Sequence, residues 1–148
     1  MKLADSNILV ALAVAEHQHH DTASEWLTAQ ISFGEVAICR ATQTALLRLL
    51  TTKSVMNGYG SRPLTNREAW DVYQGLLADR RITYLQEPPN VDQHWQRLAV
   101  REMSSPKLWM DAYLAAFAVG AGCELVTFDS AFQQFDGLIL ELLPAISA

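Results

Sequence analysis

Three aspartates, Asp5, Asp111 and Asp129, stand where carboxylates can do chemistry. Asp5 and Asp129 each come at the end of an expected strand, while Asp111 lies in a nearly all-apolar helix, beyond its first turn. If the strands are parallel, their carboxyl ends meet at one edge of the sheet. Three carboxylates close together repel, so not all stay ionised without a cation. Mg²⁺ prefers such oxygen ligands and can activate water for attack on a phosphodiester.

Each aspartate also has a purely structural explanation. Asp5 could cap a helix that starts near Asn7, and Asp129 could cap a turn through Ala131. Asp111 is harder to explain in this way, because a carboxylate among apolar neighbours is costly without a partner or a metal. The joint pattern is therefore more specific than any one of its members.

Three further polar residues accompany the aspartates. Gln43 lies on the apolar stripe of an expected helix over residues 41–51, so it is either a satisfied core amide or a member of the site. Asn7 could be a helix-start residue only, and Thr127 fits the role of strand filler better than that of a ligand. The residues alone leave these alternatives open.

Several cations could hold a phosphate backbone against the negative charge of an acidic site. The candidates for RNA contacts are Arg40, Arg48, Lys53, Arg62 and Lys107. A solvated surface explains each of them equally well. The cluster of His17, His19 and His20 is better explained as an exposed helix junction than as a metal site, because no carboxylate is spaced to complete one.

Composition narrows the function classes. Half of the 148 residues are apolar and 18% are charged, which indicates a globular chain, and we expect one domain over residues 1–148. A net charge of −5 argues against coating nucleic acid or anionic membrane by charge alone. Serine-hydrolase, P-loop and dinucleotide motifs are absent from the sequence.

The setting that we expect is a reducing cytoplasm. Cys39 and Cys123 sit in apolar contexts and fit small buried hydrophobic residues. The amino terminus does not have the pattern of a signal peptide, since Asp5 interrupts it at once. The apolar helices are too short to span a membrane, so no membrane partner is expected.

Strands and helices alternate along the chain, which predicts a parallel sheet with helices on its faces. Strands are expected over residues 2–4, 36–39, 80–85, 125–128 and 137–142. Helices are expected over residues 7–15, 41–51, 65–78 and 91–103, after a cap at Asp21, and from Pro106 onward. Residues 53–63 are expected to form a loop, because they contain Asn57-Gly58, Gly60 and Pro63.

With these residues placed, the chain resembles the PIN-domain family, and more closely the VapC toxins of type II toxin–antitoxin systems. The resemblance covers essentially the whole chain and rests on five blocks in order. These are DSNILV from Asp5, RATQ from Arg40 with LLRLL from Leu46, PLTxxEA from Pro63, DAYLAAFA from Asp111 and LVTFDxxF from Leu125. Each block is weak alone, but five in order are a strong signal.

The resemblance implies an α/β fold, a PIN-like three-layer sandwich in which a central parallel sheet is flanked by helices. It implies a metal-dependent endoribonuclease that uses Mg²⁺, or Mn²⁺, and leaves a 5′-phosphate and a 3′-hydroxyl. Family members usually form homodimers and are inhibited by a cognate antitoxin. Asp5, Asp111 and Asp129 match the family's acidic, metal-binding positions, and Asn7 and Thr127 match polar residues beside them.

One departure from the family pattern concerns Gln43, because PIN domains commonly carry a glutamate there. The glutamine carbonyl can still accept a hydrogen bond from metal-bound water, or ligate directly. The site loses one negative charge, which favours one metal over two.

Two other functions stay open at this point. In the first, Gln43 marks a decayed site, and the chain is a non-catalytic PIN-like module that binds RNA or a protein. In the second, the chain is a phosphoacceptor receiver-type domain, which would need an acidic pair after the first strand. Only Asp5 is present there, so the receiver reading ranks last.

Overall fold

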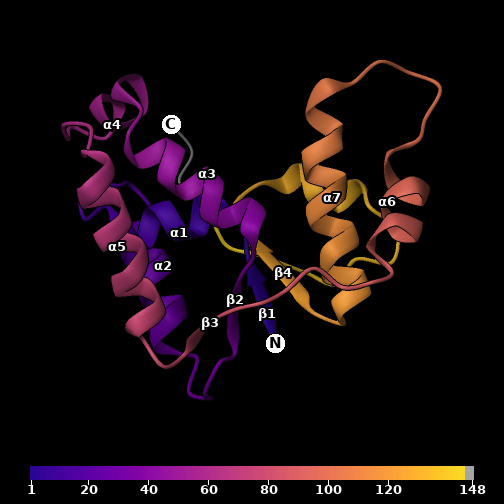
Figure 1. Ribbon diagram of the computed structural model, residues 1–148, viewed down its shortest axis with the longest axis horizontal. Coiled ribbons are helices and arrows are strands. Elements are labelled where there is room, and N and C mark those ends of the chain that lie inside the picture. Colours follow the sequence, from indigo (N-terminus) through magenta and orange to yellow (C-terminus); the bar gives the residue numbers. More distant parts are fainter. Residues whose placement is uncertain (146–148) are drawn as a thin grey trace.

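The computed structural model describes residues 1–145, in which five short strands form one parallel sheet of order β3-β2-β1-β4-β5 (Figure 1). The strands are β1 (Lys2–Ala4), β2 (Val36–Ile38), β3 (Ile82–Tyr84), β4 (Glu124–Thr127) and β5 (Leu140–Leu142). Every neighbouring pair is parallel, as the sequence predicted. All five carboxyl ends therefore lie at one edge of the sheet.

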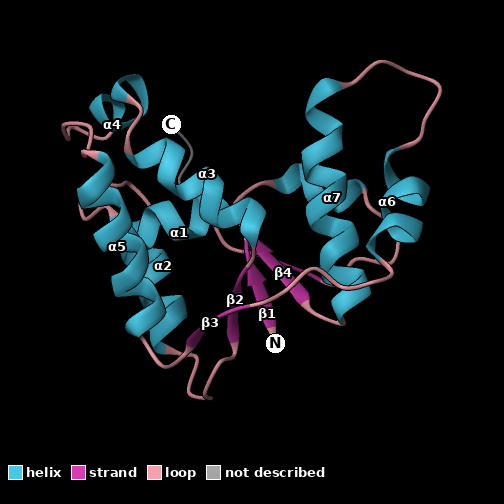
Figure 2. Ribbon diagram, in the orientation of Figure 1, coloured by secondary structure: helices cyan, strands magenta, loops and turns pink. Residues whose placement is uncertain are grey.

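The helices form two layers, one on each side of this sheet (Figure 2). Those of the first layer are α1 (Ser6–Ala13), α2 (His20–Thr28), α3 (Arg40–Leu50), α4 (Lys53–Gly58) and α5 (Asn66–Ala78). The second layer holds α6 (Val91–Ala99) and α7 (Pro106–Ala121), and the 3-10 helix η1 (Ser130–Gln134) joins β4 to β5. The predicted three-layer α/β sandwich is confirmed.

The two faces of the sheet follow from the period of two residues along each strand. Leu3 and Leu125 point into the core beneath α6 and α7, while their chain neighbours Ala4 and Val126 point into the core beneath α1 and α3. Because both faces are covered, β2 is apolar and buried along its whole length instead of alternating with polar residues.

Helix α7 has the start and the end that its sequence indicates. Pro106 occupies the first turn, although Ser105 makes no side-chain capping hydrogen bond. The helix ends at Gly122, which has a φ of 69° in the left-handed region that favours glycine. Asp111 is consequently the sixth residue of the helix, too far along for the helix dipole to account for it.

Three expectations about local structure are wrong. Residues 53–63 are not all loop, because α4 forms at their start and buries Met56 against the core. Helix α6 stops at Ala99 instead of residue 103, where Val100 turns to an extended conformation. Asp21 is not the cap of α2, since that helix begins one residue earlier with His19 at its N-cap.

Other boundaries agree with the sequence to within one or two residues at most ends. The capping box of α5 is present, with Thr65 and Glu68 exchanging side-chain to backbone hydrogen bonds of 3.0 and 3.1 Å. Cys39 and Cys123 are buried and free, as expected. Within residues 1–145, the helices fall short of the length and apolar character that crossing a membrane requires.

Candidate active site

Asp5 lies at the carboxyl end of β1 and is both a helix cap and a member of an acidic group. Its Oδ1 accepts the backbone N–H of Ser6 at 2.7 Å, which caps α1, and its Oδ2 accepts the hydroxyl of Thr127 at 2.8 Å. Burial raises the pKa of Asp5, the two hydrogen bonds lower it, and the charges of Asp111 and Asp129 raise it again. Asp5 therefore caps α1 and also lies beside the other two aspartates, so its structural explanation does not exclude a place in a metal site.

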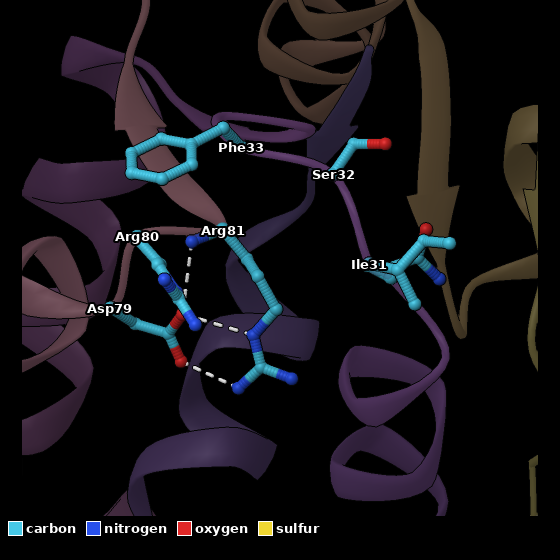
Figure 3. A pocket seen from close by; sticks show the side chains of 7 residues that line it. Ile31, Ser32, Phe33, Asp79, Arg80 and Arg81 are labelled. Atoms are coloured by element: carbon cyan, nitrogen blue, oxygen red, sulfur yellow. Dashed lines mark hydrogen bonds and ion pairs between the residues drawn. The ribbon is translucent and has the colours of Figure 1, made fainter.

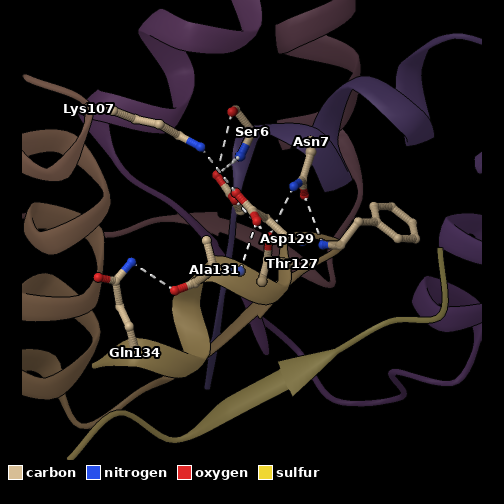
Figure 4. Close-up of polar contacts among 9 residues, drawn as sticks. Ser6, Asn7, Lys107, Thr127, Asp129, Ala131 and Gln134 are labelled. Carbon is tan, nitrogen blue, oxygen red and sulfur yellow. Dashed lines mark hydrogen bonds and ion pairs between the residues drawn. The ribbon is translucent and has the colours of Figure 1, made fainter. Parts of the chain in front are cut away.

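Thr127 links the end of β4 to the end of β1 (Figure 4). Besides donating to Asp5, its hydroxyl oxygen accepts the Asn7 side-chain amide and the backbone N–H of Asp129, both at 3.0 Å. The carbonyl of Asn7 in turn accepts the N–H of Phe128 at 3.3 Å. Thr127 and Asn7 therefore fix where the first and last acidic residues stand relative to one another.

Asp129 and Asp111 complete the acidic group from β4 and α7. Asp129 Oδ1 accepts the N–H of Ala131 at 2.9 Å at the start of η1, and its Oδ2 lies 3.9 Å from Lys107 Nζ. Burial raises the pKa of Asp111, the charge of Lys107 lowers it, and the charge of Asp129 raises it. The structure thus brings the three predicted aspartates within electrostatic reach of one another.

The acidic group suits a divalent cation in its chemistry but does not form a closed cage. Among residues 1–145, no three His, Cys, Asp or Glu side chains are gathered tightly enough to form a finished set of metal ligands. Mg²⁺ commonly keeps several waters and takes one or two protein carboxylates. All-oxygen donors whose charges raise one another's pKa therefore fit a partly hydrated hard cation.

Gln43 is buried, as its position on the apolar stripe of α3 predicted, but its side-chain carbonyl accepts a hydrogen bond from an arginine. Its Oε1 accepts Nη1 of Arg40 at 2.6 Å, and the Arg40 guanidinium also lies over the ring of Tyr84, 5.3 Å from the centroid. Gln43 does not line the cavity next to the acids. In this arrangement its oxygen holds Arg40, so its predicted contact with metal-bound water stays a prediction.

A cavity of about 850 Å³ opens beside the acidic group, between α3 and α7. Asp5 and Asp111 line one part of it, and Arg40 and Arg48 line the α3 side. Asp111 also borders a smaller cavity of about 130 Å³, together with Lys107 and other residues. The acidic group is accordingly flanked by cations in two directions.

The predicted RNA-binding residues fall into two sets. Arg40, Arg48 and Lys107 lie at these two cavities. Arg62 instead makes two hydrogen bonds to Glu68, at 2.9 and 2.7 Å, on the loop before α5. Lys53 begins α4 and lines neither cavity.

A third cavity, of about 550 Å³, is lined by residues that precede β2 and β3, at the amino-terminal edge of the strands. Figure 3 shows the side chains that line it. It contains the exposed Phe33 and an ion pair between Arg81 and Asp79 whose hydrogen bonds are 2.6 and 2.9 Å long. None of the residues predicted to do chemistry lines it.

The histidine cluster packs as a junction, as expected. His17 lies against Tyr59 and His19 stacks on Phe128, with ring centroids 4.5 and 4.6 Å apart. The junction is not exposed as expected, because His19 is buried and His17 and His20 are partly buried.

Sequence reasoning missed the residues that line the far part of the large cavity. They are Tyr84 of β3, Glu87 after it, Trp95 of α6 and Tyr113 of α7. The aromatic residues among them fall on apolar helix stripes or in a strand, where they are expected in the core. Their shared cavity depends on how α6 and α7 pack over the sheet, which the sequence does not reveal.

Comparison with known proteins gives the chain its family. The PIN domain matches residues 2–138. Ribonuclease VapC41 of Mycobacterium tuberculosis is 51% identical over 144 residues, which are 97% of this chain and 99% of the relative. Ribonuclease VapC29 of the same species is 32% identical and covers 96% of both chains.

A solved structure shows the same fold at low sequence identity. Mycobacterium tuberculosis VapC20, described as a Sarcin-Ricin loop cleaving toxin, superposes with a TM-score of 0.65 at 18% identity over 97% of this chain and 100% of its own. Taken with the family match and the 51% identity to VapC41, the sandwich and its acidic edge lead to one assignment. The chain belongs to the PIN-domain family.

Proposed function

We propose that this protein is a Mg²⁺-dependent endoribonuclease toxin of a type II toxin–antitoxin module. The observation that supports this most is the group of Asp5, Asp111 and Asp129 at the carboxyl edge of the sheet, whose charges act on one another beside a cavity lined by arginines. The similarity to the VapC ribonucleases supports the same activity.

In this proposal the three aspartates hold the divalent cation, Mg²⁺ or alternatively Mn²⁺. When bound, the cation would lower the pKa of a water molecule and stabilise the negative charge that develops on the phosphate. Thr127 and Asn7 position Asp5 and Asp129 through the hydrogen bonds described above. Gln43 serves the site by holding Arg40 at the cavity.

The cations near the acidic group bind the RNA backbone. Arg40 and Arg48 line the large cavity and Lys107 the small one, so a strand crossing Asp111 has a cation on both sides. Fixed positive charges at these points offset the repulsion between the RNA phosphates and the carboxylates. Lys53 and Arg62 are the weaker candidates, because they lie away from both cavities.

A cognate antitoxin and a second copy of the chain are the protein partners in this proposal. Trp109 and Met110 of α7 are each 54% exposed next to the acidic group, and such apolar side chains beside a site favour a protein partner. The solved structures similar in fold include VapBC2 of Rickettsia felis bound to a promoter DNA fragment, with a TM-score of 0.63. We place the protein, as a single domain, in the cytoplasm, where its free cysteines stay reduced.

The test is cleavage of total RNA by the protein made in a cell-free system, with Mg²⁺ or with EDTA, followed by mapping of the new ends. The proposal expects Mg²⁺-dependent cuts that leave 5′-phosphates and 3′-hydroxyls, and no cuts by Asp5→Asn. Glu25→Gln, which changes an exposed carboxylate on α2, is the matched control and should cleave like the wild type.

Two results would count against the proposal. If cleavage persists in EDTA or in the Asp5→Asn variant, the assignment of the aspartates as metal ligands is wrong. RNA binding without any cleavage would instead support the non-catalytic module.

A further inference from the structure

The large cavity extends beyond the acidic group into a part walled by aromatic rings. Trp95 and Tyr113 meet there edge to face, with ring centroids 5.2 Å apart, and Tyr113 lies 6.2 Å from Phe117 in the same manner. The indole N–H of Trp95 donates to the backbone carbonyl of Trp109 at 2.9 Å. These contacts hold the rings in place, so the wall is formed before any ligand arrives.

A carboxylate lies at the rim of this aromatic part. The hydroxyl of Tyr113 donates to Oε1 of Glu87 at 2.5 Å, and Glu87 and Gln86 both line the cavity and are exposed. An ionised carboxylate only accepts hydrogen bonds. The Tyr113 hydroxyl takes up one lone pair of one oxygen, which leaves Oε2 available to a ligand that carries donors.

Two arginines of α3 line the same cavity as the acidic group and the aromatic rings. The Arg40 guanidinium lies over the ring of Tyr84. Arg48 also lines the cavity, eight residues further along α3. A ligand that spans the cavity therefore meets carboxylates suited to a metal, guanidiniums suited to a phosphate, and rings suited to a flat aromatic group.

We propose that the cavity walled by Trp95 and Tyr113 binds one unpaired nucleobase of the RNA strand whose phosphodiester lies at the acidic group, and that Glu87 selects guanine there. Proteins read single-stranded RNA by stacking bases on aromatic side chains and by hydrogen bonding to their Watson–Crick edges. Guanine carries neighbouring donors at N1 and N2 on that edge, which a carboxylate oxygen can accept, whereas uracil offers one donor between two acceptors. The inference rests on the proposed RNA-cleaving function and names the feature of the substrate next to the cut.

A side chain of a protein partner is the competing occupant. The guanidiniums of Arg40 and Arg48 favour an anionic strand over a basic peptide, and the combination of acidic, cationic and aromatic groups in one cavity suits a nucleotide. The cavity, of about 850 Å³, is also large enough for a nucleotide rather than for one side chain.

The test measures binding separately from cleavage, using Asp5→Asn protein in EDTA. The probes are a fluorescently labelled U octamer and three octamers with a single central G, A or C. We expect the G octamer to bind about 5- to 150-fold more tightly than the U octamer, the range for a well-placed set of base-edge hydrogen bonds. Adding Glu87→Gln should remove this preference, and Glu25→Gln should keep it.

A second variant tests the aromatic wall. Tyr113→Leu removes a ring that stacks, so all four octamers should bind about 5- to 150-fold more weakly. Tyr113→Phe keeps the ring and loses the hydroxyl that holds Glu87, so it should lower the preference for guanine while largely keeping the affinity for the U octamer. Circular dichroism melting of each variant shows whether it is folded.

The outcomes separate this inference from the proposed function. Equal affinity for all four octamers, or a guanine preference that survives Glu87→Gln, would overturn the inference even if the wild type cleaves RNA. A guanine preference that depends on Glu87, in a wild type that cleaves nothing, would support the inference and refute the proposed function. Failure of every octamer to bind, while a purified protein partner shields the Tyr113 ring from solvent, would assign the cavity to that partner.

Discussion

The hydroxyl of Thr127 donates to Asp5 Oδ2 at 2.8 Å, which ties the carboxyl end of β4 to that of β1 across 122 residues of sequence. Both side chains are buried, Thr127 completely. Thr127 therefore orients Asp5 and stands two positions before Asp129. The acidic group forms only when β1 and β4 pair.

Thr127→Val should destabilise the protein. Valine keeps the shape but leaves Asp5 Oδ2 and the Asn7 amide without a buried partner, which costs about 1–3 kcal/mol. Urea unfolding measures the loss. Thr127→Ser, which keeps the hydroxyl, should lose clearly less; equal losses in both variants would show that the methyl packing matters rather than the hydrogen bonds.

Gln43→Glu should move the site toward metal binding and away from RNA binding. The new carboxylate forms an ion pair with Arg40, which reduces the positive charge that this arginine offers to a phosphate, and it adds one negative charge near the acidic group. We expect tighter Mg²⁺ binding by calorimetry and weaker binding of single-stranded RNA in EDTA.

Gln93→Glu, on the exposed side of α6, makes the same charge change away from Arg40 and is the matched control. If it alters RNA affinity as much as Gln43→Glu does, overall charge explains the effect and the Arg40–Gln43 contact does not.

The two arginines Arg48 and Arg62 should differ in their effect on RNA binding. Arg48 lines the cavity, whereas Arg62 is paired with Glu68. Arg48→Ala should weaken binding and flatten the plot of log affinity against log salt concentration by about 0.7, the value for one contact to a single strand. Arg62→Ala should leave that slope unchanged, and the opposite ranking would move the RNA path to the loop before α5.

In the metal-free protein, the contribution of Asp5 and Asp111 to stability should fall as the pH rises above about 3.8, the ordinary pKa of an aspartate, through their raised folded pKa values. A raised folded pKa means that the folded state binds more protons than the unfolded state in that window, so stability is greatest at its acid end. Asp79, whose pKa is lowered to about 2, acts in the opposite direction below 3.8.

The contribution of Asp5 is isolated by comparing unfolding free energies of the wild type and Asp5→Asn in EDTA across pH 4 to 7, about the range over which paired carboxylates and histidines set protein stability. The variant keeps one side-chain oxygen, which can serve either the cap or the Thr127 hydroxyl, and it carries no charge at this position. Its unfolding free energy should therefore depend less on pH. Mg²⁺ should stabilise the wild type at neutral pH and the variant hardly at all. A parallel pH dependence of both proteins would argue against a raised pKa at Asp5.

The convergence of the three aspartates was predictable because it follows from topology. Once β1 and β4 are parallel neighbours, their carboxyl ends share an edge, and the early position of Asp111 in α7 brings it to the same edge. The burial of Gln43 was equally predictable from the period of α3.

The surroundings of the acidic group were not predictable, because they depend on tertiary packing. The partner of the Gln43 carbonyl is Arg40, three residues earlier on the same helix, yet the choice between this arginine and a metal-bound water depends on where Tyr84 and the acids lie. Helix α4 forms in a segment rich in turn residues because Met56 packs into the core beneath it. That packing depends on the tertiary structure and cannot be seen in the local sequence.

Metal-dependent RNA cleavage by the acidic group can be measured as the cleavage rate of one defined RNA across a Mg²⁺ titration, for the wild type, Asp111→Asn and the control Glu25→Gln. We expect cleavage that saturates with Mg²⁺ in the wild type and the control. The rate of Asp111→Asn should be lower by about 100-fold or more, the size of effect expected when a group that stabilises transition-state charge is lost. A rate in Asp111→Asn within a few-fold of the wild type at every Mg²⁺ concentration would contradict the proposed role of the acidic group.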